Sequence, residues 1–139
     1  MIPLAHAILT SIGIPVYALF DADGGFEMRA KANGQPQNKI DDQRNNHIKE
    51  NRAALKYFGR TEEDFPLAIV ADEVAIFEDH LETFLSKNWP DWFTACNNLE
   101  AAAGISLAKN QRAYRTATLE ATGTVPEMLR QILVKAEGK

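Results

Sequence analysis

Hydrophobic positions recur at helical spacing at the start of the chain and then give way to a short unbroken apolar run. Leu4, Ile8 and Ile12 lie one helical turn apart, and Gly13 follows where a helix commonly ends. The run 15–20 is apolar throughout and contains aromatic and β-branched residues. Such a run is typical of a strand that is covered on both faces, as in a parallel sheet between helices. The pattern predicts a helix followed by a buried strand.

A polar stretch comes next. Residues 24–37 are rich in Gly, Asn, Gln and Pro, which predicts a mobile loop. A long helix is expected over about 39–58, closed by Gly59. Residues 41–46 in its first half are polar all round, and Ile48, Leu55 and Phe58 form an apolar stripe only later.

Two short apolar runs in the middle of the chain, 67–70 and 74–77, flank Ala71-Asp72-Glu73 and predict a hairpin. The rest of the chain has helical patterning. Trp89, Trp92 and Phe93 share one helical face, which favours core packing over a surface for stacking bases. Four helices are expected after the hairpin, over about 78–86, 89–103, 110–122 and 126–136.

Together these elements predict an α/β fold with a mostly helical C-terminal part. They divide the chain into an α/β region, residues 1–86, and a helical region, residues 87–139, packed on it. The elements make only part of a doubly wound sheet, and a buried strand needs neighbours on both sides. We therefore expect the first strand of the domain to lie upstream of Met1.

Composition narrows the classes of function. Fifteen Lys and Arg against 19 Asp and Glu give a formal charge of -4, which excludes a generally basic nucleic-acid coat but not a nuclease whose carboxylates hold cations. The single cysteine, Cys96, excludes an intramolecular disulfide and is typical of a reducing cytoplasm, where we expect the protein. The longest apolar stretch, 14–20, is far short of the ~20 residues that cross a membrane.

Asp21 and Asp23 are the sharpest chemical signal. Alternate residues of a strand point to the same side, so both carboxylates are expected together at the strand's C-terminal end. Ligands bind at that end in open α/β sheets, and two neighbouring carboxylates favour a hard cation such as Mg²⁺ or Mn²⁺. The alternative is an ordinary turn, because Asp and Gly are common turn residues.

A second acidic set, Glu78, Asp79 and Glu82, falls at the expected start of a helix, with Asp79 and Glu82 on one face. The alternative is a favourable interaction of these acids with the helix dipole. Asp72 and Glu73 form the tip of the expected hairpin and are predicted to be solvated.

Lys109 precedes an expected helix, where it could meet an anionic substrate or be an ordinary surface lysine. The three histidines, His6, His47 and His80, show no spacing typical of metal ligands. We expect them to be solvated or at the edge of the core.

The Asp-x-Asp segment belongs to a series of segments that resemble one family, in the right order. Residues 14–23, IPVYALFDAD, look like the Asp-x-Asp strand of TOPRIM domains, specifically those of the OLD (overcoming lysogenization defect) ATP-dependent endonucleases. Residues 51–59 are similar to the helix that follows it, and residues 74–82 to a later strand with its acidic continuation. Residues 104–110 and 123–126 resemble the C-terminal helical part.

This resemblance implies a partial TOPRIM-like, Rossmann-like sheet that lacks its first acidic strand. It also implies two-metal cleavage of DNA phosphodiesters with one or two Mg²⁺ or Mn²⁺ ions, in a protein that carries an ABC-type ATPase upstream. By position, Asp21 and Asp23 would be metal ligands, and Asp79 and Glu82 would complete the metal site. Asp79 would also take part in catalysis, and Lys109 would face the scissile phosphate. Without the first strand, the isolated chain is expected to have little activity.

Two other hypotheses for the function of this chain remain open. Residues 20–25, FDADGG, superficially resemble the nucleophile loop of HAD-type phosphatases, in which Asp21 would attack phosphorus and Asp23 would act as acid and base. That chemistry needs a later lysine and another pair of acids, each after a further parallel strand. The third reading is a folded fragment that packs or forms a homo-oligomer and does no chemistry.

Overall fold

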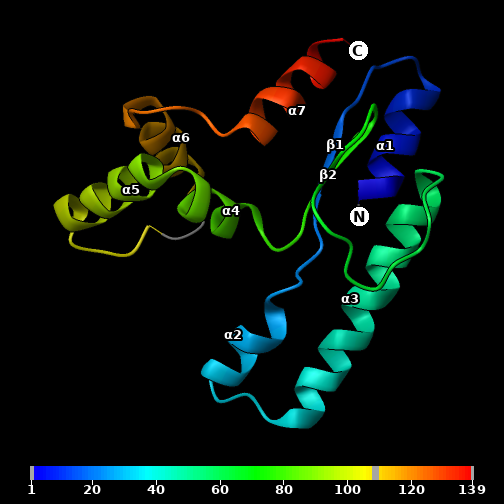
Figure 1. Ribbon diagram of the computed structural model, residues 1–139, viewed down its shortest axis with the longest axis horizontal. Coiled ribbons are helices and arrows are strands. Elements are labelled where there is room, and N and C mark those ends of the chain that lie inside the picture. The colour runs from blue at the N-terminus through cyan, green and yellow to red at the C-terminus, as the bar shows by residue number, and fades with distance from the viewer. Residues whose placement is uncertain (1, 108–109, 139) are drawn as a thin grey trace. The chain divides into compact units, whose positions relative to one another are not determined.

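Three short strands and seven helices form within residues 2–107 and 110–138, the part of the chain that the computed structural model describes (Figure 1). The fold is mixed α/β and mostly helical, as predicted. No helix in the described ranges has the length and apolar character needed to cross a membrane. The elements are α1 (Ile2–Ser11), β1 (Ala18–Asp21), α2 (Phe26–Ala32), α3 (Gln37–Tyr57), β2 (Ile69–Val70), β3 (Val74–Phe77), α4 (Leu81–Asn88), α5 (Pro90–Ala103), α6 (Gln111–Glu120) and α7 (Glu127–Glu137).

The chain divides into two compact units. The first comprises Met1–His80 together with Arg130–Lys139, and the second comprises Leu81–Leu129. The sheet belongs to the first unit.

The sheet has the strand order β1-β3-β2. The predicted hairpin is confirmed, because β2 pairs antiparallel with β3. Strand β1 runs parallel to β3, with Ala18 opposite Val74 and Asp21 opposite Phe77. All four residues of β3 are buried, so the strand that is covered on both faces is β3.

The prediction that residues 15–20 form a strand buried on both faces is wrong. Strand β1 begins only at Ala18, and Leu19 is 44% exposed. Within the described chain β1 pairs with β3 alone and forms an edge of the sheet. An edge strand lacks a neighbour on one side, and its outward face is less completely covered.

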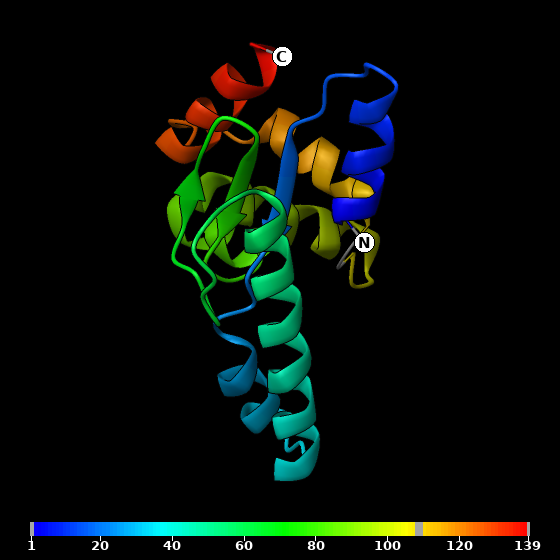
Figure 2. The same cartoon turned by 90° about the vertical axis from the view of Figure 1, so that its right-hand side faces the viewer.

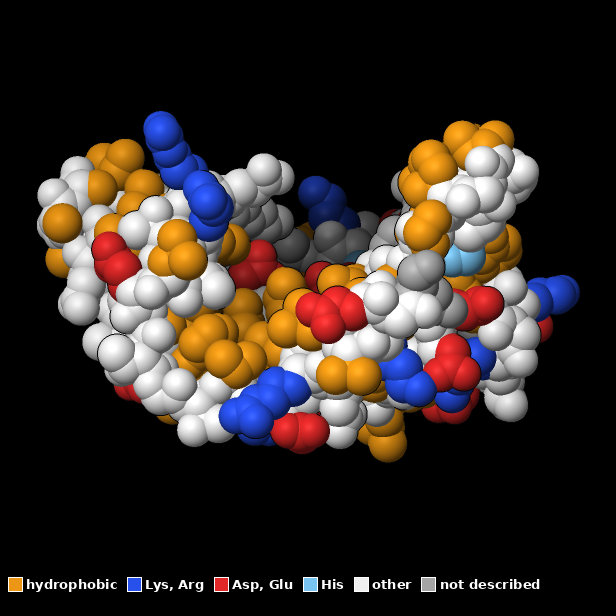
Figure 3. All heavy atoms as spheres, turned by 90° about the horizontal axis from the view of Figure 1, so that it is seen from above, with side chains coloured by type: hydrophobic (Ala, Val, Ile, Leu, Met, Phe, Trp, Pro, Cys, Tyr) orange, Lys and Arg blue, Asp and Glu red, His pale blue; other side chains and the backbone are white. Residues whose placement is uncertain are grey.

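The predicted N-terminal helix and the predicted helix over about 39–58 are confirmed as α1 and α3. Both lie beside the sheet (Figures 1 and 2). Leu55 of α3 is buried in a cluster with residues of β1, β3 and the β1–α2 loop, namely Ala18, Ala22, Val74 and Ile76. The His6 ring of α1 packs edge-on against Tyr57 and Phe58 at the end of α3, and its Nδ1 lies 3.0 Å from the Tyr57 hydroxyl. Leu4 and Ile8 of α1 stay exposed, as does Ile12 directly after it. Figure 3 shows hydrophobic side chains, in orange, on the surface of the molecule.

The prediction of a mobile loop over residues 24–37 is wrong, because helix α2 forms within this segment. Phe26 and Ala30 of α2 are buried with Ile40 of α3, and Phe65 packs against them. Glycine and proline gather at the two ends of the segment, whereas its middle, FEMRAKA, contains good helix formers. Burial of one apolar face against α3 stabilises a helix that would be too short by itself.

The second unit contains α4, α5 and α6. Trp89 and Trp92 are buried in its core, as predicted, while Phe93 is 47% exposed and that part of the prediction is wrong. The indole Nε1 of Trp89 donates to the Thr122 carbonyl at 2.9 Å, and buried tryptophan commonly finds such a partner. Helix α4 begins at Leu81 rather than at residue 78, which changes the environment of the acids before it.

Candidate functional site

The candidate site lies where β1 and β3 end. Because the two strands are parallel, their carboxyl ends reach the same edge of the sheet. The chain segments that follow stay side by side, since the Gly24 amide donates to the Glu78 carbonyl at 2.9 Å. Asp23 and Asp79 leave the two strands at equivalent places, and the fold therefore brings together two acids that are far apart in sequence.

The expectation that Asp79 lies in the first turn of a helix is wrong. Asp79 follows β3 and precedes α4, so the helix dipole does not account for it and it shares no helical face with Glu82. Strand pairing, not helical periodicity, sets its neighbours.

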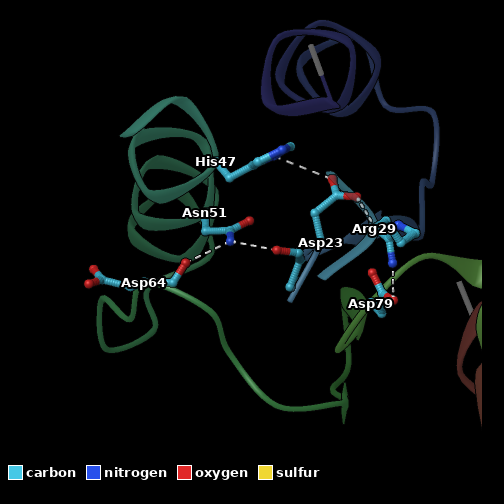
Figure 4. A network of polar contacts seen from close by, with 7 residues as sticks. Asp23, Arg29, His47, Asn51, Asp64 and Asp79 are labelled. Carbon is cyan, nitrogen blue, oxygen red and sulfur yellow. Dashed lines mark hydrogen bonds and ion pairs between the residues drawn. The ribbon is translucent and has the colours of Figure 1, made fainter. Parts of the chain in front are cut away.

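One arginine joins the two acids. The Arg29 guanidinium donates from Nη1 to Asp79 Oδ2, and its Nη2 lies 3.6 Å from Asp23 Oδ1. On the other side of Asp23, His47 Nδ1 lies 3.5 Å from Oδ2 (Figure 4). Helix α2 supplies Arg29 and α3 supplies His47. We call these four residues the carboxylate–arginine cluster.

Two glycines let the loop after β1 approach the end of β3. A Cβ atom on Gly24 would lie 2.8 Å from the Glu78 carbonyl oxygen, and one on Gly25 would lie 2.8 Å from Arg29 Nη1 and also collide with the Asp79 carboxylate. Any other residue at these positions would push against backbone or against the cluster itself. The Gly-Gly pair therefore serves the close packing of this site.

Charge in the cluster favours an ionised Asp79. Burial by itself would raise the pKa of Asp79, but the hydrogen bond from Arg29 and its positive charge outweigh burial, and the pKa is lowered. The charge of His80 and the Gly25 amide act in the same direction. Two carboxylates opposite one guanidinium leave a formal charge of -1 before the histidine is counted.

A hard cation fits part of this arrangement. Asp79 Oδ1 is buried and has no hydrogen-bond partner, so an oxygen donor remains available beside the ion pair. Among residues 2–107 and 110–138, no group of three or more His, Cys, Asp or Glu side chains is arranged to hold a metal ion. Mg²⁺ commonly takes one or two protein carboxylates and completes its shell with water and phosphate oxygens. Asp23 and Asp79 fit a site of that kind rather than a complete protein cage.

The other acids predicted from sequence are not members of the carboxylate–arginine cluster. Asp21 is the last residue of β1 and its side chain is exposed. Glu82 is in α4, in the second unit. Lys109 lies outside the described residues. Asp72 is exposed as predicted, and Lys135 Nζ lies 2.5 Å from its Oδ1.

Sequence reasoning missed Arg29, His47 and Asn51. Asn51 is 4% exposed, and its Nδ2 donates to the carbonyl oxygens of Ala22 at 2.9 Å and Asp64 at 2.7 Å (Figure 4). A signal for Asn51 exists in the chain, because it falls on the same helical face as Leu55 and is polar where an apolar residue is expected. No comparable signal marks Arg29, because the sequence of residues 24–37 predicts a loop there rather than a helix.

Comparison of the chain with protein-family models, with curated proteins and with solved structures gives no significant match. The resemblance to OLD endonucleases stays a prediction that rests on the segments quoted above.

Proposed function

We propose that this chain is the metal-binding region of a TOPRIM-type DNA endonuclease similar to the OLD nucleases, which hydrolyses phosphodiesters. The observation that carries the proposal is the convergence of Asp23 and Asp79 at the C-terminal ends of two adjacent parallel strands. Ligands commonly bind at this edge of α/β sheets, and paired carboxylates are the usual means of holding Mg²⁺ or Mn²⁺ for phosphoryl transfer.

Each residue has a role in this proposal. Asp23 and Asp79 hold the cation, and by resemblance Asp21, the last residue of β1, is a further ligand. When bound, the metal supplies positive charge opposite the phosphate oxygens on which negative charge develops. The lowered pKa of Asp79 suits a metal ligand better than a general base, because lowering the pKa of a carboxyl group makes its carboxylate a weaker base. By resemblance, Glu82 adds a further ligand and Lys109 faces the phosphate.

The free edge of β1 supports a place in a longer protein. Within the described chain β3 is the one strand that pairs with β1, and Leu19 of this edge strand is 44% exposed. Exposed strand edges readily accept another strand. We propose that an upstream strand bearing an acidic residue pairs there and that an ABC-type ATPase precedes it, with DNA as the substrate.

Thermal unfolding with added metal tests the site. Mg²⁺ or Mn²⁺ should raise the melting temperature of the wild-type chain by about 3 °C or more at saturation, because a ligand that binds only the folded state stabilises it. The Asp23→Asn/Asp79→Asn double variant should lose this response. Asp42→Asn, in the exposed part of α3, removes a carboxylate elsewhere and should keep it.

An equal metal response in the wild type and the double variant would remove the site assignment. Hydrolysis of a chromogenic phosphoester that depends on Asp21, without any nicking of DNA, would instead favour the phosphatase reading.

A further inference from the structure

We propose that Arg29 is a built-in counter-cation that competes with a divalent metal for Asp23 and Asp79. The proposal rests on the proposed function of this site, and it adds a regulatory contact to it. In this arrangement Arg29 sets the metal concentration at which the site loads.

The Arg29 guanidinium lies where a bound cation would lie, between the carboxylates of Asp23 and Asp79. Its Nη1 donates to one carboxylate and its Nη2 faces the other, and the two acids come from the ends of different strands. Figure 4 shows Arg29 lying between Asp23 and Asp79. A metal ion held by the same two carboxylates would have to take the place of that positive charge.

Arg29 satisfies the acids only in part. It reaches one oxygen of each carboxylate, and Asp79 Oδ1 stays buried without a hydrogen-bond partner. An arginine selected for an ion pair alone commonly engages both oxygens of one carboxylate in a fork. A doubly charged ion can compensate both carboxylates at once, whereas the guanidinium carries a single charge.

The Arg29 side chain can move away from Asp23 and Asp79 while helix α2 stays folded. Its side chain is 33% exposed, which gives the guanidinium a path to solvent. Helix α2 is held by other contacts, since Phe26 and Ala30 are buried against Ile40. Partly exposed ion pairs contribute little to stability, so a metal of modest affinity can displace this one.

The rival interpretation is that Arg29 only fastens α2 to the end of β3. A purely structural ion pair predicts that its loss weakens folding and either leaves metal binding unchanged or reduces it. A competing cation predicts the opposite sign for metal binding. The two interpretations therefore differ in a quantity that stability alone does not report.

The experiment is a titration of the 139-residue chain with Mn²⁺, with the free ion measured by its electron paramagnetic resonance signal. Arg29→Met should bind Mn²⁺ about fivefold more tightly than the wild type. Lys31→Met is the matched control, because it removes the same charge from the same helix and leaves the cluster intact; Lys31 pairs with Glu27 at 2.8 Å. It should bind Mn²⁺ as the wild type does.

Unchanged or weaker binding by Arg29→Met, with the wild-type affinity abolished in Asp23→Asn/Asp79→Asn, would overturn the competition and leave the metal site standing. Binding that survives in the double aspartate variant would overturn the metal site and the competition together.

A second measurement covers the case in which Arg29→Met fails to fold. In the wild-type chain, the Arg29 side-chain Nε resonance should shift on titration with diamagnetic Mg²⁺ and saturate with it, while that of Arg52, which pairs with Asp64 at 2.6 Å, should stay in place. An Arg29 resonance that does not move at saturating Mg²⁺ would overturn the proposal.

Discussion

At Asn51 a single buried amide holds two loops beside the end of β1. Its Nδ2 donates to the carbonyl oxygens of Ala22 and Asp64, and Ala22 immediately precedes Asp23. Asp23 itself has a φ of 55°, a left-handed conformation that aspartate tolerates better than most residues. The amide thus fixes the backbone on which one of the two site carboxylates depends.

Asn51→Ala should destabilise the chain by about 2–3 kcal/mol, because two carbonyl oxygens lose a donor in a buried place. Chemical denaturation measures this loss. Asn45→Ala, on the exposed side of the same helix, is the control and should change stability by about 0.5 kcal/mol or less. A loss in Asn51→Ala no larger than in the control would show that the two hydrogen bonds carry no weight.

At the scale of elements, Glu27 joins α2 to α3. It pairs with Lys31 one turn along its own helix at 2.8 Å and with Arg44 of α3. The hydrogen bond from Lys31 is the largest cause of its lowered pKa; burial opposes this, and Arg44 and the charges of both cations reinforce it. The short α2 is therefore fastened by charge as well as by its buried apolar face.

Acid should loosen this fastening. A carboxyl group whose pKa is lowered by folding stabilises the folded state above its ordinary pKa, here 4.5, and this contribution is lost as the pH falls through the lowered value. Glu27→Gln should therefore melt below the wild type at about pH 6, and the difference in melting temperature should shrink as the pH falls below 4.5. Thermal unfolding over a series of pH values on both sides of 4.5 checks this, with exposed Glu50→Gln as the control. A gap that persists in acid would contradict the assignment.

At the scale of the whole molecule, the described sheet has three strands, and β1 keeps an unpaired edge. Apolar side chains also remain exposed on α1, including Leu4, Ile8 and Ile12. Small sheets with free edges and exposed apolar positions favour association with further chain. This supports the proposal that the catalytic site is completed by a strand outside residues 1–139.

The isolated chain should accordingly nick supercoiled plasmid poorly or not at all with Mg²⁺ or Mn²⁺. In the proposed nuclease the acidic residue of the upstream strand activates the attacking water, and a general base commonly contributes about 100-fold or more to the rate. Gel analysis of plasmid nicking over time measures this, with Asp23→Asn as the background control. Robust nicking that disappears in Asp23→Asn would show that the chain supplies the missing acid itself.

Much of the fold could be predicted from local pattern. The helices α1 and α3, the hairpin of β2 and β3, and the later helices follow from the spacing of apolar residues within each segment. Helix α2 could not be predicted in this way, because Phe26 and Ala30 stabilise it only by packing against Ile40, which lies in another helix. Local propensity is silent about such contacts.

For the candidate site, the sequence by itself determined that Asp21 and Asp23 stand where an apolar strand ends. Only the tertiary structure decided that β3 is the central strand and that Asp79 emerges beside Asp23. The tertiary structure also places the positive charge of Arg29 between Asp23 and Asp79. The physical reason is that strand order depends on hydrogen bonds between segments far apart in the chain. The hydrophobic pattern within one segment does not show which other segment it pairs with, or in which register.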